Sequence, residues 1–364
     1  MTFKVAVYTI CKNEEKYVQR WYESTKDADY HILTDTGSTD GTVELARSLG
    51  ITVNEISLKP FRFDDARNAS LIFVPTDVDY CIALDVDEIC APGWREALEK
   101  AHAKGIDRPT YRRIEAFNED GSPLTEFNGF KVHRRFGIRW HYPIHEVLDW
   151  YSTEEEKSEF IEGFEIHHHQ NKETSRAQYL PLLEMAVKEK PDARNLYYLG
   201  RELSYYKEYE RSKEMLLKYL EISIFKQERS SACRILGIVD PDNAEEWFTK
   251  ATEEWESRES FLALANYYYL RKEWDECHLV AKTALRFDKK PMEFLVEAWA
   301  WGHMAEDLVA VSAWQLGDYK TALHHGLKAL ALAPDNERLQ SNVRFYESKV
   351  SDANVQSDDV RGTE

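Results

Sequence analysis

The stretch Cys81-Ile82-Ala83-Leu84-Asp85-Val86-Asp87-Glu88 is an apolar run that ends in two carboxylates one residue apart. Its apolar part predicts a buried β-strand, and the acids then lie where that strand leaves its sheet. Ligands of open α/β sheets bind just past the carboxyl ends of the strands. Because alternate strand residues point the same way, Asp85 and Asp87 are placed to converge on one ligand.

Two carboxylates at this spacing form a donor set for a divalent cation. Hard oxygen ligands suit Mg²⁺ or Mn²⁺, with water and substrate phosphates completing the shell. The motif therefore predicts metal-assisted chemistry on a phosphorylated donor. An isolated pair is more readily explained as a solvated acidic turn after a strand, so the rest of the chain has to decide between the two interpretations.

Strand-like and helix-like segments alternate through the first half of the chain. The expected strands are 4–10, 30–34, 51–56 and 80–84, and the expected helices are 14–25, 42–49, 63–73 and 94–103. This rhythm predicts an α/β domain with a mostly parallel, Rossmann-like sheet and helices on both faces. Shorter segments rich in aromatic residues, arginine and histidine follow over 111–169, and they predict an antiparallel extension that carries the acceptor side of a site.

The second half, from about Arg176, is helical and weakly repetitive. Three turns each carry an aromatic residue between helical stretches: Tyr206-Lys207-Glu208-Tyr209, Lys272-Glu273-Trp274 and Leu316-Gly317-Asp318-Tyr319. They resemble the turns of tetratricopeptide (TPR) repeats, whose period is ~34 residues, although an ordinary helical bundle is the alternative. We predict an α/β domain at 1–172, an all-α TPR-like domain at 173–350 and a disordered tail at 351–364.

Charge and cysteine content bound the function further. The formal net charge of -18 argues against a general nucleic-acid binder and disfavours unmodified duplex DNA as a partner. Five cysteines without a C-x-x-C pair indicate reduced thiols. No apolar run approaches the ~18–20 residues that cross a bilayer, and the first residues are too interrupted for a signal peptide. We therefore expect a cytoplasmic protein without a transmembrane segment.

Further short motifs accompany the D-x-D pair in a fixed order between residues 3 and 170. They are Lys12-Asn13-Glu14, Asp35-Thr36-Gly37-Ser38-Thr39-Asp40-Gly41-Thr42, Phe63-Asp64-Asp65-Ala66-Arg67-Asn68, then Asp85–Asp87 itself, and finally Arg134-Arg135-Phe136 with His141-Tyr142-Pro143-Ile144-His145-Glu146. Each one is weak alone. Together, in this order and at the expected strand ends, they resemble the family-2 glycosyltransferases of the GT-A fold.

The resemblance implies a nucleotide-binding role for acids at the strand ends. Glu14 and Asp35 are expected to accept hydrogen bonds from ribose hydroxyls or a base N–H, and Asp65, or its neighbour Asp64, is expected to contact the base. For Glu14 and for the two aspartates, enrichment of a first helical turn in acid is the alternative, because the helix dipole favours it. Asp40 is better explained as a helix cap.

Two arginines are candidates for the donor diphosphate. Arg67 can pair with phosphate oxygens in fork geometry, with a surface ion pair to Asp64 as the alternative. Arg135 belongs with Arg134 and Arg139 to a basic, aromatic patch that suits a diphosphate, an anionic acceptor or a nucleic-acid backbone. Pairing with the many acids of the chain explains that patch equally well.

The resemblance also implies the metal ligands. Asp85 is expected to reach the donor ribose or sugar, and Asp87 to ligate the metal, which stabilises negative charge on the leaving group. His168 matches a histidine that related enzymes place after the last strand of the catalytic domain. His145 is a further candidate ligand, or a group that orients the acceptor, with a half-buried structural histidine as the alternative.

Glu146 is the candidate base that takes the proton of the acceptor. Family members often have an acidic pair at this place, whereas this chain has His145 followed by Glu146. Asp149 and Glu88 are therefore kept in reserve for the same role.

The resemblance implies a metal-dependent, inverting glycosyltransferase that uses Mn²⁺ or Mg²⁺ and a nucleotide-sugar donor, for which a UDP-sugar is the first expectation. The acceptor would be a hydroxyl or thiol on a peptide or protein, a glycan or a modified nucleobase. The repeat domain would recognise the acceptor or mediate homodimer formation. Two alternatives are a scaffold with a vestigial donor site and a phosphohydrolase of the haloacid-dehalogenase type, which also uses a D-x-D motif.

Overall fold

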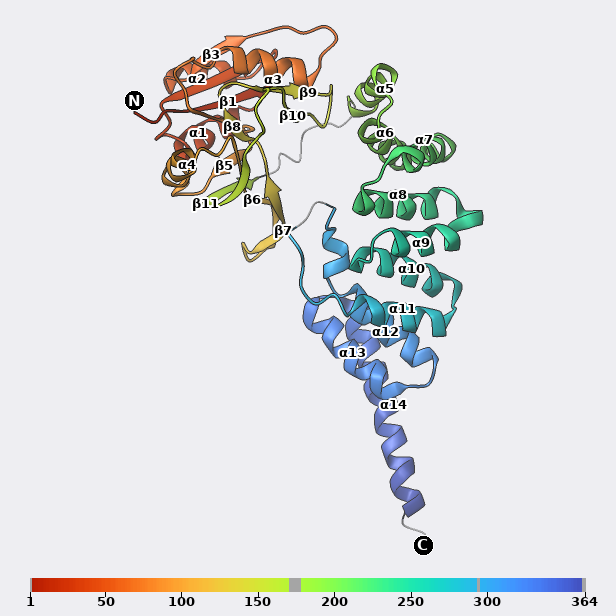
Figure 1. Cartoon of the computed structure of the whole chain (residues 1–364). Coiled ribbons are helices and arrows are strands. Elements are labelled where there is room, and N and C mark those ends of the chain that lie inside the picture. The colour runs from red at the N-terminus through yellow and green to blue at the C-terminus, as the bar shows by residue number, and fades with distance from the viewer. Residues whose placement is uncertain (1, 170–177, 293–294, 362–364) are drawn as a thin grey trace. The chain divides into compact units, whose positions relative to one another are not determined.

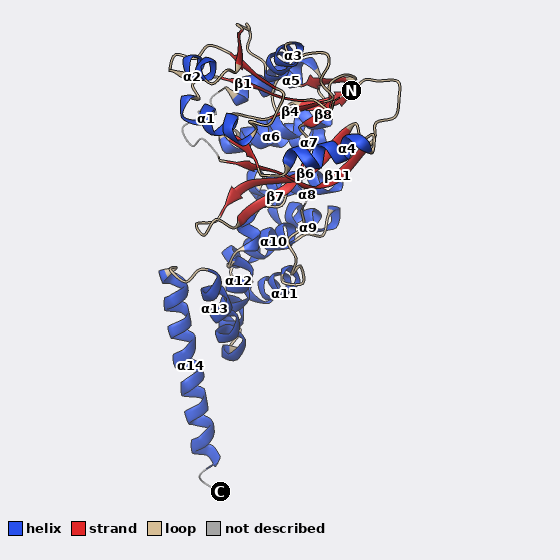
Figure 2. Cartoon of the chain, turned by 90° about the vertical axis from the view of Figure 1, so that its left-hand side faces the viewer, coloured by secondary structure: helices blue, strands red, loops and turns tan. Residues whose placement is uncertain are grey.

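The computed structural model describes residues 2–169, 178–292 and 295–361, and the chain divides into two compact units. The first comprises 1–190 with 292–294, and the second comprises 191–291 with 295–364. Within the described residues, every strand belongs to the first unit and the second is helical (Figures 1 and 2). The boundary predicted between residues 172 and 173 lies outside the described residues and stays a prediction.

The central sheet of the first unit has five strands in the order β3-β2-β1-β4-β8. These are β3 (Thr52–Glu55), β2 (Tyr30–Asp35), β1 (Val5–Cys11), β4 (Tyr80–Ala83) and β8 (Val132–Arg134). The first four are parallel and β8 is antiparallel to β4, which confirms the mostly parallel sheet. The strand order reverses between β1 and β4, and such a switch point is where open α/β sheets bind ligands.

Helices cover both faces of this sheet, as the alternating apolar residues of β1 require. They are α1 (Glu15–Ser24), α2 (Thr42–Ser48), α3 (Phe63–Ile72) and α4 (Trp94–Ala103). Val5 and Val7 belong to a buried cluster with residues of α1, α2 and α4, including Trp21. Ala6 and Tyr8 belong to a second buried cluster with residues of α3 and of the later strands.

A second sheet begins directly after the D-x-D motif. Its order is β5-β11-β6-β7, formed by β5 (Glu88–Cys90), β11 (Ser158–His168), β6 (Arg108–Phe117) and β7 (Pro123–Gly129). A separate hairpin pairs β9 (Ile138–His141) with β10 (Val147–Trp150). Most of this region is antiparallel, as predicted, but β6 and β11 run parallel. The forty residues between them include β7 to β10, and a connection of that length lets a strand return in the same direction.

The second unit is built from successive helical hairpins. Its helices are α6 (Ala193–Tyr205), α7 (Tyr209–Ile222), α8 (Lys226–Val239), α9 (Ala244–Glu254), α10 (Arg258–Arg271), α11 (Trp274–Ala284), α12 (Met304–Gln315), α13 (Tyr319–Leu332) and α14 (Glu337–Arg361), with short 3₁₀ segments at Pro241–Asn243 and Ala298–Trp301. A further helix, α5 (Tyr179–Glu189), belongs to the first unit.

The turns inside three hairpins share one backbone conformation. Lys207, Lys272 and Gly317 each have a φ between 61° and 83°, and each lies between the two helices of its hairpin. The three aromatic turns found in the sequence are therefore equivalent positions of a TPR-like array. Of the tail predicted at 351–364, α14 extends to Arg361 and residues 362–364 lie outside the description. No described helix has the length and apolarity to cross a membrane.

Candidate active site

The loops that follow β1 and β2 interlock at the carboxyl edge of the central sheet. The backbone N–H of Asn13 donates to Ser38 Oγ at 2.9 Å, and Asn13 Oδ1 accepts from Thr39 N at 2.7 Å. Asn13 adopts a φ of 58°, a left-handed conformation that asparagine tolerates better than most residues. The backbone N–H of Glu14 donates to Thr42 Oγ1 at 2.9 Å. These bonds hold the Lys-Asn-Glu element and the Asp-x-Gly-Ser element together as one wall.

Asp35 lies in this wall, buried at the end of β2. Its Oδ2 accepts from the backbone N–H of Gly37 at 2.9 Å and of Ser38 at 3.0 Å, so the carboxylate shapes the turn that follows. Gly37 has a φ of 109°, which explains the glycine in this turn. Asp40 accepts from the backbone N–H of Thr42, the first residue of α2, at 3.1 Å, but the N-cap position itself is Gly41, so the predicted cap lies one residue too early.

Arg67 of α3 joins two of the predicted acids. Its Nη2 donates to Asp85 Oδ1 at 2.7 Å and its Nε donates to Glu146 Oε1 at 2.5 Å. Burial by itself would raise the pKa of Asp85, but Arg67 and Lys131 lower it below its usual range. The Nη1 atom of Arg67 is buried and has no hydrogen-bond partner. An orphaned guanidinium N–H of this kind is a ready donor to an anionic or hydroxyl-bearing ligand.

Asn68, the next residue of α3, brings Glu146 to this place. Its side chain donates to the Trp140 carbonyl at 2.9 Å and accepts from Trp140 N at 2.8 Å, which anchors β9 to the helix. The chain after β9 turns sharply, with a φ of 81° at Tyr142 and 51° at His145. The two motifs Ala-Arg-Asn and His-x-x-x-His-Glu are thus parts of one structure.

Lys131 provides a second cation for the first acid of the motif. Its Nζ lies 2.5 Å from Asp85 Oδ2 and 3.4 Å from Glu88 Oε1. Glu88 is fully buried and its Oε2 accepts from the backbone N–H of Asp85 at 2.9 Å. Arg113 of β6 donates from Nη1 to the remaining oxygen of Glu88. A buried carboxylate therefore supports the turn that presents Asp85.

The second acid of the motif is held by His168 at the end of β11. His168 Nε2 lies 3.1 Å from Asp87 Oδ2, and its Nδ1 lies 3.0 Å from Glu115 Oε1. Burial opposes a charged imidazole, but hydrogen bonds to Asp87 and Glu115 raise the pKa of His168 to about 10. His168 and Arg113 lower the pKa of Glu115 to about 2, against the effect of its burial.

The Asp87–His168 pair fits a divalent cation. A carboxylate oxygen and an imidazole nitrogen both ligate such ions, and these two side-chain atoms lie 3.1 Å apart. His145 does not join them: its ring packs edge-on to Tyr179 of α5, with 5.8 Å between centroids. The described residues contain no group of three or more histidine, cysteine or acidic side chains that could hold a metal ion. The pair would thus leave most of the ion's ligand positions to substrate and water.

Three other predicted residues lie outside this cluster. Arg135 donates to the Val74 carbonyl at 2.9 Å, and it follows β8, whose Arg134 pairs with the amino end of β4. It is therefore at the opposite edge of the sheet from the D-x-D motif. Asp65 is exposed and lies 3.6 Å from Arg62. Asp149, a reserve base, pairs instead with His141 at 2.6 Å.

Sequence inspection missed Lys131, Arg113 and Glu115. A signal existed for two of them, since Arg113 and Glu115 occupy alternate positions of one strand and so share a face that is otherwise expected to be apolar. Lys131 stands three residues before a predicted arginine patch, and no spacing rule connects it to an acid 46 residues earlier.

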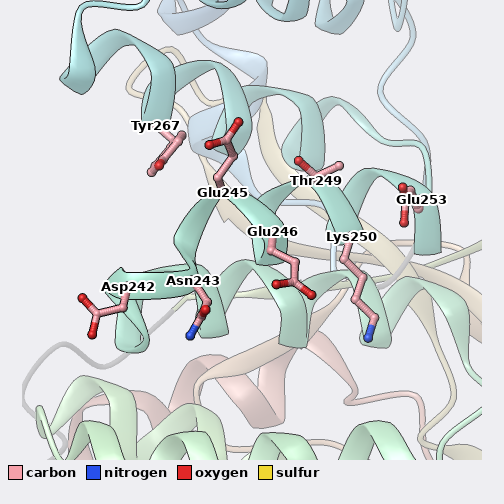
Figure 3. Close-up of a pocket in the computed structure, with 8 residues that line it drawn as sticks. All are labelled: Asp242, Asn243, Glu245, Glu246, Thr249, Lys250, Glu253 and Tyr267. Carbon is pink, nitrogen blue, oxygen red and sulfur yellow. The ribbon is translucent and has the colours of Figure 1, made fainter.

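A hollow of about 520 Å³ lies in the second unit along α9 and α10 (Figure 3). It is lined by Asp242, Asn243, Glu245, Glu246, Thr249, Lys250, Glu253 and Tyr267. Four of the eight lining residues are acidic, and none of the eight is a residue that the sequence singled out for chemistry. The chemical groups of interest therefore lie in the first unit.

Comparison with known proteins also finds an enzyme family in the first unit. The family described as glycosyl transferase family 2 has a sequence model that matches residues 6–145. No curated protein matches the chain. Glucosyl-3-phosphoglycerate synthase from Mycobacterium tuberculosis, solved with Mn²⁺, UDP-glucose and phosphoglyceric acid, is 22% identical over 30% of this chain and 44% of its own, with a TM-score of 0.27. The similar region thus spans less than half of that synthase.

Solved TPR structures resemble another part of the chain. PilF of Pseudomonas aeruginosa is 20% identical over 46% of this chain and 72% of its own, with a TM-score of 0.36. A TPR protein of Thermus thermophilus is 20% identical over 46% of this chain and 88% of its own, with a TM-score of 0.32. No functional conclusion follows from similarities of this size.

Proposed function

We propose that this chain, whose residues 6–145 match the family model of the family 2 glycosyltransferases, transfers a sugar from a nucleotide diphosphate to an acceptor with inversion and with the help of a divalent metal. The observation that carries the proposal is the position of Arg67, which binds both Asp85 and Glu146. A donor-side acid and a candidate base thereby meet at the edge of the sheet where ligands bind.

Asp87 and His168 would hold Mn²⁺ or Mg²⁺, which supplies charge neutralisation for the departing diphosphate. Because a metal ligand must be unprotonated, His168 would give up the proton that it now shares with the two carboxylates. Glu115 would then accept a hydrogen bond from His168 Nδ1–H and keep the ring oriented. Asp85, with both oxygens bound by cations, remains a carboxylate that can accept hydrogen bonds from the donor's hydroxyl groups.

Glu146 is placed to take the acceptor's proton. In the proposed step the acceptor oxygen or sulfur bonds to the anomeric carbon while the bond from that carbon to the diphosphate oxygen breaks. The acceptor's proton passes to Glu146, and the electron pair leaves with the nucleotide. Glu146 is largely buried, its side chain being 11% exposed, and its contact with Arg67 Nε at 2.5 Å fixes its direction. The free N–H at Arg67 Nη1 would bind the donor.

The acceptor is proposed to be a peptide or protein that carries a hydroxyl or thiol and is recognised by the helical unit. Arrays of helical hairpins present extended surfaces that suit chain-like ligands. Glycan and modified-nucleobase acceptors, and use of the array for homodimer formation, are the competing outcomes. Peptides containing Ser, Thr or Cys, assayed by intact mass for an added sugar, separate them from oligosaccharide and hydroxylated-base acceptors.

The donor half is tested first because it needs no acceptor. Nucleotide release from UDP-, GDP- and TDP-sugars is measured with and without Mn²⁺ for the wild type and for Asp87→Asn. We expect slow, Mn²⁺-dependent hydrolysis of one donor, with UDP-glucose tested first, and at least a 100-fold loss in Asp87→Asn. Asp77→Asn is the matched control, since Asp77 is an exposed acid paired with Lys4.

Two results would count against the proposal. One is a wild type that neither hydrolyses any of these donors nor gains thermal stability from a nucleotide with Mn²⁺. The other is an Asp87→Asn variant that hydrolyses the donor as fast as the control does.

A further inference from the structure

The two acids of the D-x-D motif are connected by a continuous chain of alternating charge. From Asp85 it passes in order through Lys131, Glu88, Arg113, Glu115 and His168 to Asp87. The residues come from the D-x-D turn, from β5, β6 and β11, and from the segment before β8. The chain thus links residues that are far apart in sequence.

The contacts of this chain are close along its whole length. Arg113 Nε lies 2.8 Å from Glu115 Oε2 and its Nη1 contacts Glu88, so one guanidinium serves two acids. Glu115 and His168 are 3.0 Å apart, and His168 and Asp87 are 3.1 Å apart. Glu88 is fully buried, and the Arg113 side chain is only 10% exposed.

Burying charged side chains is not the most stabilising way to fill this part of the protein interior. Replacing a buried ion pair by apolar side chains of similar volume is often neutral or stabilising, whereas removing one partner costs about 3–5 kcal/mol. A chain selected for stability alone would do as well with apolar residues here. The charged residues do something that apolar residues cannot: they fix both acids through directional bonds.

We infer that Glu88 and Arg113 are positioning residues of the proposed transferase, fixing the separation and direction of Asp85 and Asp87 through Lys131 on one side and through Glu115 and His168 on the other. This inference rests on the proposed function. Neither residue is required to touch the substrate. Their effect is on how well the two acids are placed to receive the cation and the donor together.

Arg113 is specific to this task because of its shape. Its Nε and Nη1 atoms point to different carboxylates, Glu115 and Glu88, and a lysine ammonium is a single point of charge that cannot reproduce a fork. Arg113→Lys should therefore behave like Arg113→Met in metal binding, although it keeps the charge.

The test compares stability with ligand binding in the full chain. The variants are Arg113→Met, Arg113→Lys and the double substitution Glu88→Met/Arg113→Met, and the control is Arg112→Met. Arg112 is the preceding residue of β6, and it pairs with Glu126 and Glu165 on a more exposed face. For each protein we measure the melting temperature, the affinity for Mn²⁺ in the presence of UDP by electron paramagnetic resonance of the free ion, and kcat and KM for donor hydrolysis.

Arg113→Met should lower the melting temperature, and the double variant should recover most of that loss because no buried charge of the pair is left alone. The double variant should nevertheless bind Mn²⁺ at least 10-fold more weakly than the wild type and keep a reduced kcat. In Arg112→Met the Mn²⁺ affinity, kcat and KM should each stay within twofold of the wild-type values.

The inference is overturned if the double variant recovers stability, Mn²⁺ affinity and kcat together, since the pair would then be structural only. It is also overturned if Arg113→Lys matches the wild type in Mn²⁺ affinity. A wild type that binds neither Mn²⁺ nor UDP is a separate outcome: it removes the proposed function itself, and this inference with it.

Discussion

The buried ion pairs beside the D-x-D motif of the first unit can be compared with the close helix contacts of the second unit. The first unit buries ion pairs beside the D-x-D motif, where Glu88 is inaccessible and Arg67 nearly so. The second unit relies on close contact between helices: a Cβ on Gly200 would lie 2.7 Å from a carbon of Leu216, and one on Gly237 would lie 2.6 Å from Phe248. Substitutions at the ion pairs of the first unit should therefore alter donor hydrolysis and stability together, and those at the helix contacts of the second should alter stability without altering donor hydrolysis.

The largest effect is expected from Arg67→Met. This change removes the cation that Asp85 shares with the largely buried Glu146, and loss of one partner of a buried ion pair costs about 3–5 kcal/mol of unfolding free energy. It also misplaces both acids, so donor hydrolysis should fall at least 100-fold. Chemical denaturation and nucleotide release measure the two effects. Arg47→Met is the control, because Arg47 pairs with Glu55 on the surface and exposed pairs contribute within about 1 kcal/mol. If Arg67→Met hydrolysed the donor as fast as the wild type, the buried ion pairs of the first unit would have no role in the chemistry, and the contrast with the second unit would fail.

A smaller effect, confined to stability, is expected from Gly200→Val in α6. The new side chain overlaps Leu216 of α7, and overpacking of a core costs about 1–3 kcal/mol. Adding Leu216→Ala should return part of that loss, since it makes room for the valine. Calorimetry of the full chain measures both. Donor hydrolysis below the unfolding temperature should equal that of the wild type, and a parallel loss of activity would contradict the separation of the two units.

The smallest effect concerns pH and the buried His133 of β8. Burial lowers the pKa of His133 to about 4, from an ordinary value of 6.5. Tyr8 OH lies 2.9 Å from its Nε2 and the Arg134 carbonyl 2.7 Å from its Nδ1, which suits a neutral ring. The unfolded chain binds the proton more readily, so this contribution to stability is complete above pH 6.5 and is lost as the pH falls toward 4.

Between pH 7 and pH 5 this loss amounts to about 2 kcal/mol. We expect the calorimetric transition that Arg67→Met shifts to move down over this range, and the transition that Gly200→Val shifts to move less. His133→Gln, which keeps a polar side chain without the titration, should reduce the shift. An equal shift in the variant would assign the acid sensitivity to other groups.

The sequence alone predicted the parts of the site that strand ends determine. Asp85 and Asp87 follow a buried apolar run, and their place at the carboxyl edge of the sheet comes directly from that pattern. The approach of Glu146 to Asp85 could be expected only from the order of motifs, because the contact depends on how Asn68 anchors β9. Roles for these residues as ligands or base remain predictions.

The cations between the acids could not be predicted in the same way. Glu115 meets the motif through the second sheet, and the parallel pairing of β6 with β11 that places it differs from the antiparallel extension expected. Lys131 meets the motif from the segment before β8, where its carbonyl accepts from the backbone N–H of Ala83 at the end of β4. Arg135 shows the converse, since its position in a motif suggested the donor site while the antiparallel direction of β8 carries it to the far edge. Strand direction decides both cases, and residue spacing does not encode it.

The cysteines bear on how the chain can be labelled. Cys11, Cys81, Cys90, Cys233 and Cys277 are all unpaired and buried. Burial raises the pKa of Cys81, Cys233 and Cys277 to about 12, and it raises those of Cys11 and Cys90 as well. Thiolate is the reactive form, so maleimide dyes should not react with the native thiols of the folded chain. A single cysteine introduced on the surface would then carry a fluorophore without first replacing five core residues.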